Sequence, residues 1–85
     1  MVEKEITLLN ETGLHARPAS QFIKEANKYD SSLKIIKDNK EYNGKSIMSI
    51  LSMGANKDSK LTLIAEGKDE NELINNIIEL IKKFN

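Results

Sequence analysis

Cysteine is absent from this chain of 85 residues, and histidine occurs only once. Without cysteine the protein forms no disulfide, no thiolate zinc site and no cysteine nucleophile, a composition that fits a reducing cytosol. Two Tyr and two Phe are the only aromatic residues, so little surface is present for stacking nucleic-acid bases. We therefore expect a cytoplasmic protein that uses neither thiol chemistry nor a bound metal.

Neither sign of charge is in excess, since 13 Lys and Arg balance 13 Asp and Glu. The chain thus lacks the positive field that draws proteins to nucleic acid or anionic membranes. No apolar run approaches the length of a membrane span, and acidic residues stand where a signal peptide would be apolar. The length and the 39% apolar content suit one small core. We expect a single domain over residues 1–85, with no cofactor.

Alternation of apolar and polar residues predicts four strands. These segments are residues 2–8, 33–37, 40–43 and 60–66. Asp38 and Asn39 are residue types that favour tight turns, so the second and third strands are expected to form a hairpin.

Apolar residues at three- and four-residue spacing predict three helices. The first covers residues 16–28. The second is short, with Ser46 as its N-cap and Gly54 at its end. The third begins after Asp69 and runs to the C-terminus. Glu72 lies three residues beyond Asp69, a spacing that resembles a capping box.

The order of these elements is strand, helix, strand, strand, helix, strand, helix. A sheet with one apolar face covered by helices is the simplest way to bury all of these apolar stripes. We therefore expect a two-layer α+β domain with a mostly antiparallel sheet. Periodicity alone does not fix the order of the strands.

The histidine and an arginine lie together at the expected start of the first helix, in the segment GLHARPA at residues 13–19. A helix start presents unpaired N–H groups and the positive end of the helix dipole, which favour a bound anion. Arg17 adds a planar charged fork for phosphate oxygens. His15 supplies a nucleophilic nitrogen, and Gly13 permits the tight turn that presents its ring outward. The segment predicts a phosphoryl-binding site.

Residues 13–19, together with KSIM at 45–48 and LSMG at 51–54, closely resemble HPr, the histidine-containing phosphocarrier of the bacterial sugar phosphotransferase system. The resemblance covers essentially the whole chain. It implies an open-faced sandwich of four antiparallel strands in the order 1-4-2-3, with three helices on one side.

The resemblance also implies a role for each site residue. His15 is expected to accept a phosphoryl group on Nδ1 from enzyme I, which phosphoenolpyruvate charges, and to pass it to IIA components of sugar permeases. Arg17 is expected to contact the phosphoryl group, with the backbone of Ala16 and Arg17 helping to receive it. Ser46 matches a site that a serine kinase phosphorylates in many Gram-positive-type relatives, where a catabolite-control transcription factor is a further partner. Such a protein is a monomeric relay and not an enzyme with its own substrate.

The short second helix has apolar residues on more than one face, so some of them are expected to be exposed beside His15. Exposed methionines make an adaptable surface for several partners. The equivalent family helix contacts enzyme I and IIA proteins. The residues to which this role is carried over are Ile47, Met48, Leu51 and Met53.

A second hypothesis is a regulatory or nitrogen-branch member of the family that acts mainly through protein contacts. The presence of His15 favours the carrier, because known regulatory-only relatives replace it. Ser46 alone is equally explained as a helix cap. A hydrolase is disfavoured, since no Gly-x-Ser-x-Gly pattern occurs. Ser49, where relatives commonly have glycine or another small residue, and the polar loop at residues 55–59 are expected to affect partner preference and recognition by a Ser46 kinase. Neither is expected to touch the phosphoryl chemistry directly.

Overall fold

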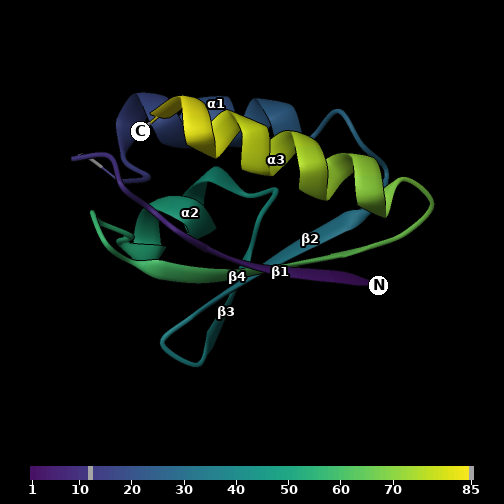
Figure 1. Cartoon of the computed structure of the whole chain (residues 1–85), viewed down its shortest axis with the longest axis horizontal. Helices are drawn as coiled ribbons and strands as arrows, with labels where there is room; N and C mark the ends of the chain where they lie inside the picture. Colours follow the sequence, from purple (N-terminus) through teal and green to yellow (C-terminus); the bar gives the residue numbers. More distant parts are fainter. Residues whose placement is uncertain (12, 85) are drawn as a thin grey trace.

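The computed structural model describes residues 1–11 and 13–84, and its elements follow the predicted order. Helices α1 and α3 lie side by side over one face of the sheet, with α2 beside them (Figure 1). None of the described helices is long and apolar enough to span a bilayer. The elements are β1 (Val2–Thr7), α1 (Ala16–Ala26), β2 (Ser32–Lys37), β3 (Lys40–Asn43), α2 (Ile47–Met53), β4 (Lys60–Glu66) and α3 (Glu70–Phe84).

The sheet has the strand order β1-β4-β2-β3, and every neighbouring pair is antiparallel. This confirms the fold that the resemblance implied. The hairpin between β2 and β3 turns at Asp38 and Asn39, whose φ angles are +52° and +67°. Two consecutive positive φ angles match the twist of a two-residue hairpin, which is why short polar residues are favoured there.

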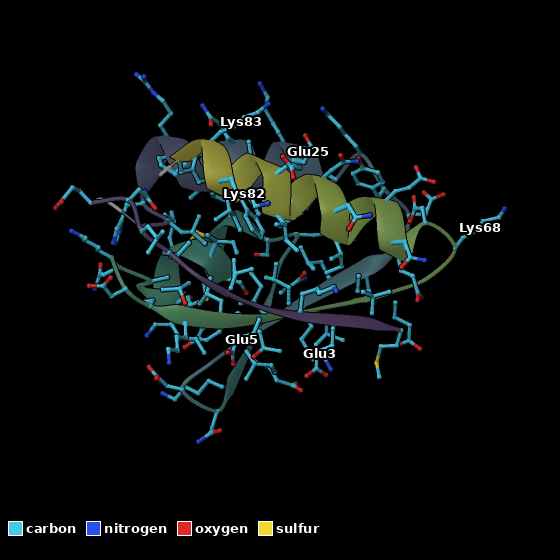
Figure 2. All side chains as sticks on the ribbon, in the orientation of Figure 1. Glu3, Glu5, Glu25, Lys68, Lys82 and Lys83 are labelled. Atoms are coloured by element: carbon cyan, nitrogen blue, oxygen red, sulfur yellow. The ribbon has the colours of Figure 1, made fainter. Side chains whose placement is uncertain are left out.

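The core lies between the helices and one face of the sheet. Leu61, Leu63 and Ala65 alternate along β4 and are buried beneath apolar helix residues such as Phe22 and Ile77. The register places the intervening residues on the opposite face. In Figure 2, Glu3 and Glu5 of β1 lie on that second face, away from the helices. The sheet is therefore covered on one side only.

The first helix ends at Ala26, two residues earlier than the sequence predicted. Asn27 is its C-cap, and both its backbone N–H and its side-chain Nδ2 donate to the carbonyl of Ile23, each at 3.0 Å. The amide of Lys28 bonds to Glu25, a tighter turn than that of an α-helix. Asn27 thus caps the helix directly after the apolar Ala26, and the polar residues Asn27 and Lys28 lie outside it.

The predicted capping box at the start of α3 is wrong, although the helix begins where expected. The backbone N–H of Asp69 donates to Ser31 Oγ at 3.1 Å, so it does not pair with Glu72. The carboxylate of Asp69 accepts hydrogen bonds from the amides of Asp30, at 3.0 Å, and Ser31, at 2.9 Å. Asp69 therefore joins α3 to the segment that leads into β2.

These contacts predict an acid-sensitive component of stability. The Ser31 hydroxyl and the Asp30 amide, which bond to the ionised carboxylate, lower the pKa of Asp69 from 3.8 to about 2. Because the pKa is lower in the folded state than in the unfolded state, the ionised carboxylate stabilises the folded state at pH values above the ordinary pKa of aspartate. This stabilisation is lost as the pH falls through the pKa of the folded state. Asp69→Asn is expected to lower Tm most above pH 3.8, and the difference from wild type should shrink as the pH approaches 2.

Thermal unfolding followed by circular dichroism at several pH values measures this effect. Glu72→Gln is the matched control, because Glu72 is exposed and lies in the same helix turn. That variant is expected to keep a Tm near wild type. A constant Tm difference between Asp69→Asn and wild type across the acid range would contradict the assignment.

Candidate functional site

His15 is the N-cap residue of α1 and is exposed to solvent. Its backbone is extended, with φ −112° and ψ 154°, and the helix begins at Ala16. No acidic residue lies in the first turn, so no local carboxylate neutralises the positive end of the helix dipole. The amides of Ala16 and Arg17 belong to the first turn, where N–H groups lack partners within the helix. An anion attached to the ring would therefore meet a favourable field.

The turn before His15 is held tightly against the loop that follows α2. Gly13 has φ +59°, and its amide bonds to the carbonyl of Asn10 at 3.2 Å. Leu14 is fully buried, and its amide donates to the carbonyl of Ala55 at 3.1 Å. The buried Leu14 side chain anchors the chain directly before His15. Residue 12, which falls within this predicted turn, lies outside the described residues.

Asn56 contacts the His15 ring, a feature that sequence reasoning missed. Its Oδ1 lies 3.0 Å from His15 Nε2. The expectation that the loop at residues 55–59 stays away from the phosphoryl chemistry is therefore wrong. The two residues are 41 positions apart, and only folding brings them together. No local pattern in the sequence could have indicated the contact.

Arg17 lies in the same helix turn as His15 and is exposed. It also borders an open groove at the α1–α2 side of the molecule. Ile23 and Ile47 give the groove apolar lining that suits contact with another protein. The residues that line it are Arg17, Ser20, Gln21, Ile23, Lys24 and Ile47.

Three of the four apolar residues expected at a docking surface are exposed on α2. Met48 is 73% exposed, Leu51 41% and Ile47 36%. We call these three residues the α2 patch. The prediction for Met53 is wrong, because its side chain is only 4% exposed and belongs to the core. Met53 lies three positions after the buried Ile50, so both project from the inward face of the helix.

Ser46 is the N-cap of α2, as predicted. Its Oγ accepts a hydrogen bond from the amide of Ser49 at 3.3 Å, and its carbonyl accepts one from Ile50 at 3.1 Å. Lys45 donates from Nζ to the carbonyl of Tyr29, which ties the start of α2 to the end of α1. Ser46 is half-buried and already has a structural role.

Within residues 1–11 and 13–84, no three His, Asp or Glu side chains are grouped so as to hold a metal ion. The first turn of α1, Arg17 and the ring of His15 form the candidate reactive site, and Ile47 of the α2 patch lines the groove that Arg17 borders. Figure 1 shows the start of α1, the helix α2 and the connection from α2 to β4 at the same end of the molecule. Such an arrangement is suited to receiving a phosphoryl group from another protein.

Comparison with known proteins agrees with this geometry. A family model described as the PTS HPr component phosphorylation site matches residues 2–83. The HPr-like protein Crh of Halalkalibacterium halodurans is 46% identical over 83 residues, which cover 98% of this chain and 99% of that protein.

Two solved structures from Thermoanaerobacter tengcongensis also match. HPr-C-His has a TM-score of 0.96 at 47% identity and covers 99% of this chain and 96% of its own. An HPr dimer has a TM-score of 0.79 at 46% identity and covers 100% of this chain and 99% of its own. On the match to the family model and on these relatives, the chain belongs to the HPr family.

Proposed function

We propose that this protein is a phosphocarrier, a single domain that takes a phosphoryl group from phospho-enzyme I on His15 and delivers it to IIA components of sugar permeases. The observation that carries the proposal is the exposed His15 ring at the N-cap of α1, with Arg17 in the following turn. Membership of the HPr family supports the same role.

The transfer needs only a nucleophile and charge stabilisation. The lone pair of His15 Nδ1 forms the new bond to phosphorus, while the bond from phosphorus to the donor atom of enzyme I breaks and its electron pair returns to that atom. The positive end of α1 and the guanidinium of Arg17 stabilise the negative charge of the adduct. Transfer to a IIA domain repeats the exchange in the opposite direction. The protein itself is the acceptor in the first exchange and the donor in the second, and it needs no cofactor, so it is a relay and not an enzyme with its own substrate.

The α2 patch and the groove beside Arg17 supply the docking surface for these partners. Arg17 lines the groove, and Ile47 belongs to both the groove and the α2 patch. Methionine and leucine adapt to differently shaped apolar partners, which suits a protein that must bind a donor and several acceptors in turn. We propose that the protein acts as a monomer, since the docking surface must be free in each exchange. We also propose that it is cytoplasmic, which is consistent with the HPr family.

Incubation with enzyme I and phosphoenolpyruvate, followed by mass spectrometry at neutral and acid pH, tests the carrier role. We expect one phosphoryl adduct on His15 that is stable at neutral pH and lost in acid, since a phosphoramidate hydrolyses readily in acid. Addition of a IIA domain should then discharge the adduct. An absence of labelling under conditions that charge a known HPr would contradict the proposal.

A second candidate function is regulation through Ser46. The observation that favours it is the likeness to proteins named Crh, one of which is described in its solved structure as a catabolite repression protein. Phosphorylation at Ser46 would add negative charge next to the α2 patch and alter partner binding. An acid-stable adduct on Ser46 after incubation with ATP and a cell extract would support this candidate. Absence of that adduct from cells grown on a preferred sugar would argue against it.

A further inference from the structure

We infer that Asn56 is a positioning residue for the phosphoryl transfer, which holds the His15 ring in the tautomer that leaves the lone pair on Nδ1. The inference rests on the proposed carrier function and specifies how this chain prepares its nucleophile. It is carried by the contact between Asn56 Oδ1 and His15 Nε2 at 3.0 Å.

The chemistry of the two groups determines where the hydrogen lies. A carboxamide oxygen only accepts hydrogen bonds, so the contact requires a hydrogen on His15 Nε2. A neutral imidazole carries one ring hydrogen, and Nδ1 is then left with the lone pair. His15 is exposed, so without this contact water could form a hydrogen bond with either ring nitrogen. The carboxamide of Asn56 thus selects one of two tautomers that are otherwise close in free energy.

The backbone of Asn56 is fixed, so the carboxamide is held near the ring before any partner binds. The amide of Asn56 donates to Ser59 Oγ at 3.0 Å, and its carbonyl accepts from the amide of Ser59 at 3.1 Å. The carbonyl of Ser59 in turn accepts from Leu8 at 3.0 Å. On the other side, the Cα of Asn56 is so close to Gly13 that a Cβ there would lie only 2.7 Å away. The loop is therefore tied both to the end of β1 and to the turn that carries His15.

This arrangement also separates the roles of the two ring nitrogens. Nε2 is turned toward Asn56 and is engaged by it. Nδ1 is the ring nitrogen nearer to the histidine backbone, and so is better placed to keep an attached phosphoryl group beside the first turn of α1. One hydrogen bond thus directs the reactive lone pair and orients the ring.

The tautomer is measured on the free protein by nitrogen-15 NMR of the His15 ring at a pH of about 8.5, where a histidine is normally neutral. Protonated and unprotonated ring nitrogens have well-separated shifts. Wild type is expected to show the hydrogen on Nε2. In Asn56→Leu, which has a side chain of similar size and no acceptor, the ratio of the Nε2–H to the Nδ1–H form should fall about fivefold, the effect of one ordinary hydrogen bond.

Two further variants complete the measurement. Asn56→Asp keeps an acceptor oxygen and is expected to restore the wild-type tautomer, which a merely structural effect of the loop would not do. Asn75→Leu changes another exposed asparagine, on α3, and should leave the tautomer of the His15 ring unchanged. Circular dichroism should show all three variants folded, because the side chain of Asn56 is exposed and the loop contacts come from its backbone.

The kinetic consequence is measured as the single-turnover rate constant for transfer from saturating phospho-enzyme I. Asn56→Leu should lower it in proportion to the fraction of the ring in the Nε2–H form, which falls by less than the fivefold change in the tautomer ratio because that form predominates in wild type. A ring that carries its hydrogen on Nδ1 in wild type, or a tautomer ratio that Asn56→Leu leaves unchanged, would overturn the inference. Failure of the carrier function is a separate result, because wild type would then accept no phosphoryl group whatever the tautomer of its free ring.

Discussion

The His15→Ala variant is expected to take up no acid-labile phosphoryl group from enzyme I and phosphoenolpyruvate. His15 is the only histidine of the chain, and cysteine is absent, so no other imidazole or thiol nucleophile remains. The hydroxyl groups of serine, threonine and tyrosine form esters that survive acid. Mass spectrometry before and after acid treatment therefore separates a true loss from phosphorylation of a hydroxyl group.

A variant with a reduced transfer rate and a control variant with the wild-type rate make this result specific. Arg17→Ala retains the nucleophile and should still be labelled, with a transfer rate constant about 30-fold lower, because a hydrogen bond to a charged group contributes roughly 2 kcal/mol. Lys68→Ala removes an exposed cation from the connection between β4 and α3 and should be labelled at the wild-type rate. Acid-labile labelling of His15→Ala at the wild-type level would show that the carrier residue is misassigned.

Much of the fold was predictable because it depends on local patterns. Alternation in residues 60–66 and the apolar stripe through Phe22 correctly indicated which faces are buried. The turn at Asp38 and Asn39 was equally local, since these residue types tolerate positive φ. The order of the strands came from the resemblance to HPr and not from periodicity, because the apolar pattern of one strand does not indicate which distant strand it pairs with.

The errors concern contacts between distant segments. The spacing of Asp69 and Glu72 matches a capping box, but Ser31, 38 positions before Asp69, provides the partner instead. Met53 was misassigned because a seven-residue helix with apolar residues on several sides gives no indication of which side the sheet covers. The contact of Asn56 with His15 is another contact between residues that are far apart in the sequence. The reactive residues were recognisable from the motif, whereas the residue that orients the ring was not.

Gly13→Ala is the stability prediction with the largest expected effect, a loss of about 2–5 kcal/mol in the free energy of unfolding. The φ of +59° is unfavourable by about 1–2 kcal/mol for a residue with a Cβ. That Cβ would also lie 2.2 Å from the carbonyl oxygen of Ala55, which is backbone and must move. The movement would strain the bond from Leu14 to Ala55 and add roughly 1–3 kcal/mol. For a domain of this size each kcal/mol that is lost lowers Tm by about 4–8 °C.

Gly54→Ala is the matched control, because Gly54 has nearly the same φ, +64°, but nothing within 4 Å of a built Cβ. Gly54→Ala introduces the unfavourable φ without the collision, so a loss of about 1–2 kcal/mol is expected. Urea denaturation of both variants separates the two terms, and the excess for Gly13→Ala measures how closely the His15 turn approaches residues 55–56. Because this approach also brings Asn56 to the ring, Gly13→Ala should disturb the His15 tautomer, whereas Gly54→Ala should not. Equal losses from the two substitutions would mean that the turn and the loop are not in contact in solution.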